Sequence, residues 1–440
     1  MNATHQNNER NELRNKTRIR NGLLRLSCGL TALCHSPPLC VGSLVYWAAV
    51  LLLPHIMVSL LDFGPLAAKV LTAVCVLPGL PAALLLYLAL VALCGTPRHA
   101  RSISESCIRS GLVNSNGEPP FVLSNRNGTI ELLAEGIPLD EFATRKGALE
   151  TALHRRITRV LQGKDIQRIV LHTASSNAQL PTKVYMDKIP EGDSIITLGL
   201  ALDGPVNVDL SVMPHALICG STGSGKTYQI LALIHQFLEK SYSVYILNMK
   251  GGADYPRYWR EVRCHLSPDL DTILETLTHL CGMRAYRQQR FDEVGDRCKD
   301  IRDYNRLNPW DRMNRVAVIC DELAEMTDQT GEDKATKEKK AAIIRCLTEL
   351  ARLGRNVGMT LICSLQRADT EAVPGKIRNN LDVRMVGRCA DTSLIPSLLG
   401  AGKTSDFAVI PLDVPGRFYC NLDGGIIFQG YVVKELENDE

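Results

Sequence analysis

The sequence has no strong excess of charge of either sign: its 440 residues carry 50 Lys and Arg against 47 Asp and Glu. Global charge therefore gives no argument for nucleic-acid binding, and any basic surface has to be local. The 15 cysteines include no Cys-x-x-Cys pair, which disfavours a zinc ribbon or a dithiol redox site. Scattered single cysteines are typical of a reducing compartment such as the cytosol. The length permits one large domain or two to three ordinary ones.

Charged side chains are also missing from two long apolar runs, residues 39–61 and 70–94. At about 1.5 Å per residue the shorter run reaches roughly 34 Å as a helix, enough to cross the hydrocarbon core of a bilayer. The short link 62–69 predicts that the two runs form a transmembrane hairpin. A pair of buried core helices is the alternative, and the length of the uncharged runs disfavours it. The lack of a charged residue within either run argues against a channel or a proton relay.

Basic residues indicate how this hairpin is oriented. Residues 1–38 contain Arg10, Arg14, Lys16, Arg18, Arg20 and Arg25, and Arg98 and Arg101 follow the second run, whereas the link carries only Lys69. The positive-inside rule then places both ends in the cytoplasm, as in a multi-pass protein of the cytoplasmic membrane. A cleaved signal peptide fits poorly, because the leading polar region is long and a second apolar run follows.

The remaining chain divides by composition. We expect a basic cytoplasmic N-terminus at 1–38, the hairpin at 39–94, a polar linker at 95–120, a small α/β module at 121–200 and a larger domain at 201–440. Within the module, apolar spacing predicts a helix over 139–161 and short strands at 169–171 and 195–198. Nothing in the module points to chemistry.

The sequence GSTGSGKT is the main chemical signal. It comprises Gly220, Ser221, Thr222, Gly223, Ser224, Gly225, Lys226 and Thr227. The apolar run 215–219 precedes it and residues 228–240 follow with helical spacing, so a strand–loop–helix context is predicted, as a Walker A phosphate cradle requires. Lys226 is expected to reach the β- and γ-phosphates of ATP, and Thr227 to bind Mg²⁺. An ordinary Gly/Ser turn is the alternative, and this context disfavours it.

A second apolar run, residues 316–320, ends in Asp321 and Glu322. This pattern is weak alone but strong beside a Walker A motif. Asp321 is expected to bind Mg²⁺ through water, and Glu322 to act as the general base for hydrolysis. A further strand at 359–364 leads to Gln366, the candidate sensor of the γ-phosphate, with a plain surface glutamine as the alternative. Strands alternating with helices predict an α/β fold with a mainly parallel, doubly wound sheet.

Several ordered blocks lie between residues 198 and 433. They are the lead into Walker A, LNMKGGADY with Lys250, ICDELAEM, LARLGRNVGMTLICSLQR with Arg355, Gly358, Gln366 and Arg367, and NNLDVRMVGR with Arg384. Together these blocks resemble the FtsK/SpoIIIE family of DNA translocases. Asn248 and Met249 stand where the family usually has Asp-Pro, and Ala368 replaces a usual Pro. The long linker, two of four usual spans and a C-terminal winged helix are not expected here. The compact plan is similar to the coupling ATPases of integrative conjugative elements.

This resemblance implies a RecA-like motor that uses ATP and Mg²⁺. The motor would form a homo-hexameric ring around double-stranded DNA and would bind that DNA independently of its sequence. Arg355 and Arg384 are then candidates for the cation that a neighbouring subunit supplies to the γ-phosphate, and Arg417 is a third. For each, a salt bridge or a DNA contact is the alternative. Five basic residues between Arg284 and Lys299 could face phosphates, although a solvated helix face is favoured.

The implied function is a membrane-anchored translocase that delivers DNA to a conjugation channel, with a relaxase and channel proteins as possible partners. The alternatives are an FtsK/SpoIIIE-like ATPase for protein secretion, chromosome or plasmid handling without transfer, and a non-motor scaffold gated by ATP. The single Walker A motif argues against secretion motors, which usually carry several.

Overall fold

A computed structural model of the chain describes all residues except 1, 61–64, 367–372, 390–398, 400–413 and 435–440. The chain forms two compact units, Met1–Ser176 and Asn177–Glu440. Arg367 and Ala368, two positions of the family-like blocks, lie outside the described residues.

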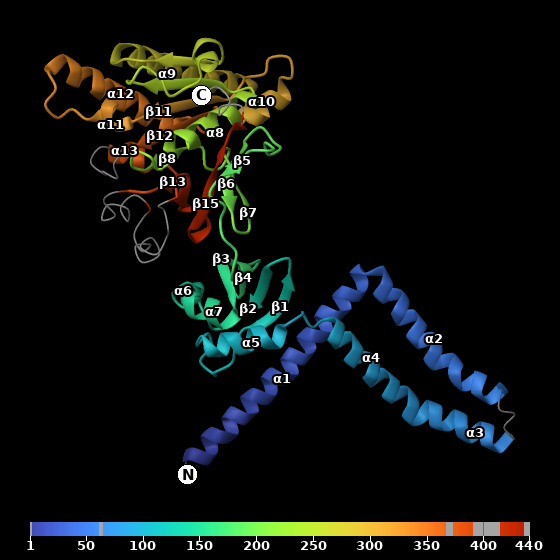
Figure 1. Cartoon of the computed structure of the whole chain (residues 1–440). Coiled ribbons are helices and arrows are strands. Elements are labelled where there is room, and N and C mark those ends of the chain that lie inside the picture. The colour runs from blue at the N-terminus through green and yellow to red at the C-terminus, as the bar shows by residue number, and fades with distance from the viewer. Residues whose placement is uncertain (1, 61–64, 367–372, 390–398, 400–413, 435–440) are drawn as a thin grey trace. The chain divides into compact units, whose positions relative to one another are not determined.

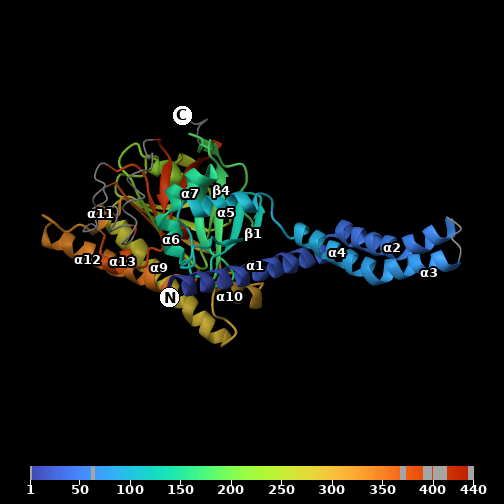
Figure 2. The ribbon, with the colours of Figure 1, turned by 90° about the horizontal axis from the view of Figure 1, so that it is seen from below.

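The first unit begins with long helices. They are α1 (Asn2–His35), α2 (Pro37–Leu60), α3 (Pro65–Val74), a π-helical turn (Cys75–Gly79) and α4 (Leu80–Cys94). α2 runs beside α3 and α4 in both directions of view (Figures 1 and 2). The hydroxyl groups of Ser43 and Tyr87 are 2.6 Å apart, and the Tyr46 hydroxyl donates to the carbonyl of Ala83 at 2.7 Å, which ties α2 to α4. The predicted helical hairpin is therefore present as a fold element, and the π-helical turn contains Pro78, where proline displaces the regular hydrogen bond.

Among the described residues, several leucines of this hairpin are exposed. Leu44, Leu85 and Leu93 are each about two-thirds exposed or more, at 72%, 69% and 67%, as lipid-facing side chains are and core side chains are not. Among the described residues, Leu77–Cys94 is long and apolar enough to cross a membrane. A second span results only if the helices Ile19–His35 and Pro37–Leu52, bent by 105°, count as one.

A small four-stranded antiparallel sheet completes the first unit, with the strand order β1-β2-β4-β3. Its elements are α5 (Ala100–Arg109), β1 (Phe121–Arg126), β2 (Thr129–Leu133), α6 (Leu139–Thr144), α7 (Lys146–Leu153), β3 (Arg155–Gln162) and β4 (Arg168–Ser175). Two expectations need correction. The helix predicted over 139–161 ends at Leu153, because Ile157 and its neighbours pair with β4 as strand β3. The expected linker 95–120 contains helix α5, whose Ile103 and Cys107 are buried in the core of the module.

The second unit is built on an 11-stranded sheet (Figure 1), in the order β10-β9-β11-β12-β8-β13-β14-β15-β6-β7, with β5 paired to β15. Its strands are β5 (Val184–Tyr185), β6 (Ile195–Ala201), β7 (Gly204–Asp209), β8 (Ala216–Cys219), β9 (Ser243–Asn248), β10 (Cys264–Ser267), β11 (Val316–Asp321), β12 (Met359–Leu365), β13 (Val383–Val386), β14 (Arg417–Cys420) and β15 (Ile426–Val432). The first six strands in this order, from β10 through β8 to β13, pair in parallel. The pairs that follow, from β13–β14 to β6–β7, are antiparallel. Residues 195–198, expected in the small module, belong to this sheet through β6, so the division between the units lies near residue 176 and not 200.

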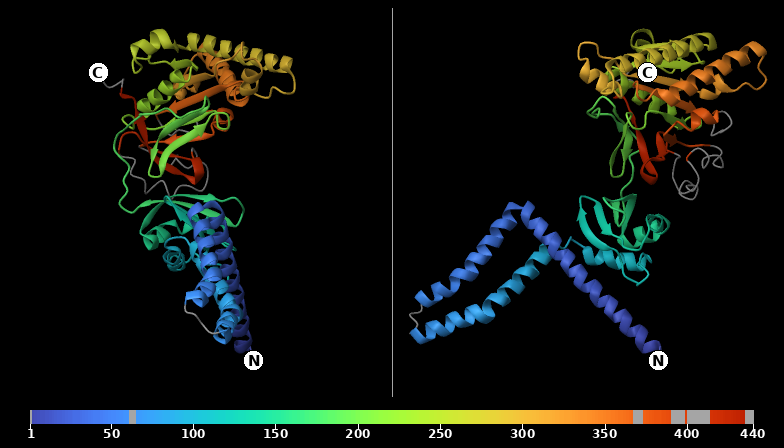
Figure 3. Two further views of the ribbon diagram at one scale, coloured as in Figure 1. Left: turned by 90° about the vertical axis from the view of Figure 1, so that its right-hand side faces the viewer. Right: turned by 180° about the vertical axis from the view of Figure 1, so that it is seen from behind.

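Helices cover both faces of the parallel part. They are α8 (Lys226–Glu239), α9 (Leu270–Val294), α10 (Ile301–Leu307), α11 (Leu323–Thr327), α12 (Lys334–Leu353) and α13 (Gly375–Arg378), with short turns at Trp259–Arg263 and Leu422–Gly424. Alternate residues of β11 separate two cores: Val318 packs with α9 and α12, and Ile319 packs with α8. Figure 3 shows these layers from two further sides. This is the predicted doubly wound arrangement, in which ligands bind at the carboxyl ends of the strands.

Candidate functional site

The glycine-rich loop lies where β8 ends and α8 begins, as predicted. All four residues of β8 are buried, and the N–H of Gly220 donates to the carbonyl of Leu365 at 3.1 Å, which fixes the start of the loop against β12. Gly223 and Gly225 have φ values of 75° and 90°, the left-handed region that glycine adopts without strain. A Cβ on Gly225 would also lie 2.3 Å from the backbone nitrogen of Gly416. The loop conformation therefore requires glycine.

Two side chains of this loop are suited to bind an anion. The hydroxyl oxygen of Ser224 is buried and has no hydrogen-bond partner among the described residues, and such groups are rare unless a ligand completes them. Lys226 is the first residue of helix α8, and its ammonium group lies 3.4 Å from a carboxylate oxygen of Glu322. Together with the N-terminus of α8, these groups fit the phosphates of a nucleotide.

Asp321, at the end of β11, is held by three hydrogen bonds. Its Oδ2 accepts from the amide of Asn248 and from the hydroxyl of Tyr255, each at 2.9 Å, and its Oδ1 accepts from the Ser364 hydroxyl at 2.9 Å. Burial, followed by the charge of Asp321, raises the pKa of Tyr255, so that its hydroxyl stays protonated and donates. The three hydrogen bonds thus orient the carboxylate at the carboxyl end of β11.

The described residues include no group of three or more His, Cys, Asp or Glu that could hold a metal ion by itself. A Mg²⁺ ion bound with a nucleotide needs no such group, because phosphates and waters fill most of its positions. Thr227 in the first turn of α8 and Asp321 at the end of β11 supply the hydroxyl and carboxylate that such an ion requires. The residues present therefore fit a nucleotide with Mg²⁺.

Glu322 follows Asp321 in a left-handed conformation, with φ 61° and ψ 69°. A non-glycine residue in this region is uncommon and is often found at functional sites. Its N–H donates to the Ser364 hydroxyl at 3.1 Å, and its Oε1 accepts from the N–H of Gln366 at 3.2 Å. The structure thus brings Glu322, Gln366 and Lys226 together, with the Gln366 side chain exposed.

The three arginine candidates differ in environment. Arg355 is exposed and donates to the carbonyl of Ser211 at 2.9 Å. Arg384 is turned toward its own chain and donates to the carbonyls of Leu381 and Arg378 at 2.9 and 3.1 Å, and burial lowers its pKa. Arg417 is buried and donates to Gln429 and to the carbonyl of Pro181. Of the three, Arg355 is the most exposed.

The basic stretch between Arg284 and Lys299 is mainly structural. Arg287 donates to the carbonyls of Val357 and Asn314 at 2.8 and 2.7 Å, and burial lowers its pKa to about 10. Arg290 pairs with Glu293 and Asp311. These contacts occupy Arg287 and Arg290, whereas Arg297 and Lys299 are exposed.

Sequence reasoning missed several residues of the site. Asn248 and Tyr255 donate hydrogen bonds to Asp321. Both belong to the block LNMKGGADY, where Asn248 and Met249 replace the usual Asp-Pro, and for that reason no role was predicted for them. Lys250, matched there, lies 3.7 Å from Glu325 at the surface. Arg388 contacts the loop itself: its carbonyl accepts from the Ser221 N–H at 2.8 Å. Its position just after β13 was the available signal.

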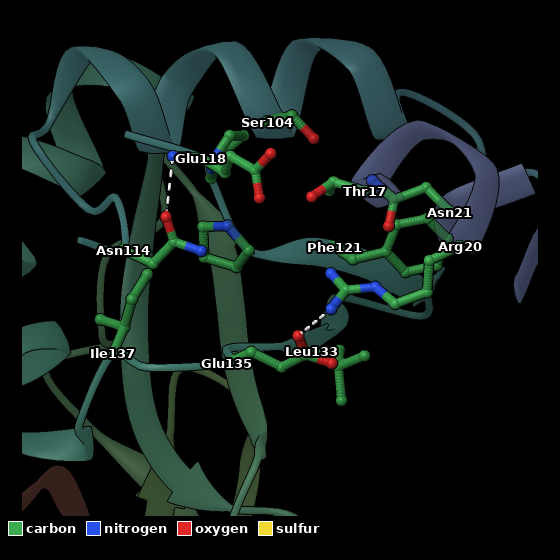
Figure 4. Close-up of a pocket in the computed structure, with 12 residues that line it drawn as sticks. Thr17, Arg20, Asn21, Ser104, Asn114, Glu118, Phe121, Leu133, Glu135 and Ile137 are labelled. Carbon is green, nitrogen blue, oxygen red and sulfur yellow. Dashed lines mark hydrogen bonds and ion pairs between the residues drawn. The ribbon is translucent and has the colours of Figure 1, made fainter. Parts of the chain in front are cut away.

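The first unit contains a pocket of about 300 Å³ (Figure 4). Arg20 of α1 points across it and forms an ion pair with Glu135, and the side chain of Asn114 accepts from the N–H of Glu118 at 3.0 Å. None of the predicted site residues lines this pocket.

Comparisons with known proteins agree with this geometry. Residues 191–369 match the model of the FtsK/SpoIIIE family. The chain is similar to the DNA translocases FtsK of Campylobacter jejuni (26% identical over 247 residues, 54% of this chain and 24% of that protein) and Helicobacter pylori (28% over 285 residues, 56% and 30%). The match thus spans less than a third of the length of these curated relatives. The chain also resembles the solved structure of the pCW3 conjugation coupling protein TcpA, a monomer form with ATPγS, at 26% identity and a TM-score of 0.56, covering 77% of this chain and 96% of that one.

Proposed function

We propose that this chain, whose motor domain belongs to the FtsK/SpoIIIE family of P-loop ATPases, is a membrane-anchored, ATP-driven translocase that delivers double-stranded DNA to a conjugation channel. The observation that carries the proposal is the assembly of Lys226, Asp321 and Glu322 around one glycine-rich loop. The conjugation role is supported by the likeness to a coupling protein over 96% of that protein's chain.

Bound ATP with Mg²⁺ supplies the phosphoanhydride bond whose hydrolysis releases free energy. The loop N–H groups and Lys226 bind and orient the phosphates. Thr227 and Asp321 would hold the Mg²⁺ ion. Glu322 accepts a proton from the attacking water, and its position is set by hydrogen bonds to Ser364 and Gln366. Gln366, at the tip of β12, senses the terminal phosphate.

We further propose that the motor works as a hexamer, with Arg355 reaching the site of the next subunit. Its exposure suits such a role better than the inward contacts of Arg384 do. A cation placed on the developing charge of a phosphoryl group accelerates its transfer by about 10³- to 10⁵-fold.

A groove of about 470 Å³ on the motor offers a contact surface for the DNA backbone. Helices α9, α12 and α13 form it, and Arg284, Arg345, Arg352 and Lys376 line it together with Glu349. Glu349 pairs with Arg284 at 2.8 Å, so the other cations give the groove a net positive charge. Side chains of this kind bind phosphates without reading sequence.

Anchoring by the α2–α4 hairpin is supported by its exposed leucines and by the basic residues on both sides of it. Such an anchor would hold the motor at the cytoplasmic face of the membrane, where a relaxase and channel proteins would meet it.

The decisive experiment is the DNA dependence of ATP hydrolysis by the purified full chain, with double-stranded DNA, single-stranded DNA and no DNA, and with Lys226→Ala as the inactive control. We expect stimulation by double-stranded DNA that is lost in the control. Equal rates with and without DNA would refute a DNA motor. Stimulation by an exported peptide instead of DNA would favour the secretion ATPase.

A further inference from the structure

Arg388 is attached to the phosphate loop by its backbone. It follows β13, and the N–H of the preceding Gly387 donates to the carbonyl of Cys219 at 2.8 Å. The carbonyl of Arg388 accepts both the N–H of Ser221, at 2.8 Å, and the Ser221 hydroxyl, at 2.9 Å. These bonds hold the backbone of Arg388 against the first residues of the loop.

The side chain of Arg388 lies over the middle of the same loop. A guanidinium nitrogen donates to the carbonyl of Thr222 at 3.2 Å, and a Cβ placed on Gly223 would be 3.1 Å from that nitrogen. Arg388 is exposed, and no ion pair joins it to a carboxylate within the part of the chain that the structure describes. A guanidinium has five N–H donors, so most of its capacity remains for an anion.

The sheet order places this cation opposite the hydrolytic residues. β8 lies between β12 and β13, so Arg388 approaches the loop from the β13 flank, whereas Glu322 approaches from the flank of β12 and β11. The loop residues from Ser224 to Thr227 join helix α8, whose N-terminus holds the inner phosphates. The terminal phosphate would then lie beside the loop segment at Thr222 and Gly223, which is the segment that the Arg388 side chain contacts.

We propose that Arg388 binds the terminal phosphate of the nucleoside triphosphate in its own subunit, exchanging the Thr222 carbonyl for a phosphate oxygen. It would thereby distinguish ATP from ADP before any residue of a neighbouring subunit engages. This inference rests on the proposed function, since it requires that the loop binds ATP. A charge-assisted bond from a guanidinium to a phosphate is among the stronger polar contacts in proteins.

The test compares the affinities of the purified full chain for ATPγS and for ADP. Arg388→Ala is expected to weaken ATPγS binding by about 10- to 100-fold, the range for a hydrogen bond to a charged group, and to leave ADP binding within about twofold. Arg388→Lys should recover part of the loss because it restores the positive charge. Arg312→Ala, which removes an exposed arginine beyond α10, is the matched control and should change neither affinity.

Two outcomes would overturn the inference. Equal losses for ATPγS and ADP would mean that Arg388 only shapes the loop, and unchanged affinities would mean that it contacts no phosphate. A structural role would also lower the melting temperature of Arg388→Ala and would not be relieved by lysine. If the unaltered protein binds neither nucleotide, the proposed function itself fails, which is a result distinct from these.

Discussion

The ammonium of Lys226 lies 3.4 Å from a carboxylate oxygen of Glu322, and both side chains are only 10% exposed. The cation that we propose to bind phosphate and the proposed general base therefore contact each other. A triphosphate that binds Lys226 competes for this contact and leaves Glu322 to a water molecule. Under the proposed mechanism, this pair would couple nucleotide binding to the availability of Glu322 as the base.

Replacing Glu322 should separate binding from hydrolysis. In Glu322→Gln the amide oxygen can still accept from the N–H of Gln366, so the fold and ATP binding are retained. Loss of the base should slow phosphate release by at least about 10²-fold. Filter retention of labelled ATP together with steady-state phosphate release measures both effects. Hydrolysis within threefold of the unaltered protein would show that Glu322 is not the base.

Arg355 and Arg384 should respond differently to substitution by alanine. Arg355→Ala is expected to keep its melting temperature and to lose hydrolysis by about 10³-fold in the assembled ring. Arg384→Ala removes donors from the carbonyls of Leu381 and Arg378 and should cost about 1–3 kcal/mol of stability. Thermal melting and ATPase rates of the two variants side by side distinguish these roles. A stable but inactive Arg384→Ala would reverse the assignment.

The groove on α9, α12 and α13 should affect DNA and not the basal chemistry. We expect the double variant Arg345→Glu, Arg352→Glu to lose most of the stimulation by double-stranded DNA while its rate without DNA is unchanged. Its remaining DNA affinity should depend less steeply on salt, because fewer counterions are released. Arg312→Glu gives the same type of charge change outside the groove and is the control. Normal stimulation of the double variant would exclude the groove as a contact surface.

His215 should make the motor sensitive to mild acid. It is buried, and its Nδ1 accepts the N–H of Leu361 at 3.0 Å; burial lowers its pKa from 6.5 to about 4. Because the unfolded chain binds this proton more readily, stability falls as the pH falls from about 6.5 toward 4. From pH 7 to pH 5 the loss is about 2 kcal/mol.

Thermal melting at several pH values measures this effect. His215→Asn keeps an acceptor near Leu361 but does not titrate, so its stability should decline less over the same range. Parallel pH profiles of the two proteins would contradict the prediction.

The topology of the hairpin can be tested with reporter fusions. Alkaline phosphatase, which is active only outside the cytoplasm, should be active when fused after Lys69 and inactive when fused after Arg101. A fluorescent protein that folds in the cytoplasm should give the opposite pattern. Activity of both phosphatase fusions, or of neither, would rule out two spans with cytoplasmic ends.

Local sequence determined much of this protein. The glycine-rich loop between β8 and α8, the Asp321–Glu322 end of β11 and the strand before Gln366 were all predictable, because each depends on a contiguous strand, loop or helix. Local apolar spacing failed at residues 154–161. Spacing that is compatible with a helix is also present in β3, and pairing with β4 decided between the two.

Only the tertiary structure decided which distant residues complete the site. Hydrogen bonds from Asn248 and Tyr255 orient Asp321 across 73 and 66 positions of sequence, and Arg388 reaches a loop 166 positions before it. The order of strands in the sheet creates these contacts, and no local pattern encodes that order. The chain alone therefore specified a phosphate cradle, while folding specified which side chains surround it, because parallel strands bring their carboxyl ends to one edge regardless of their separation in sequence.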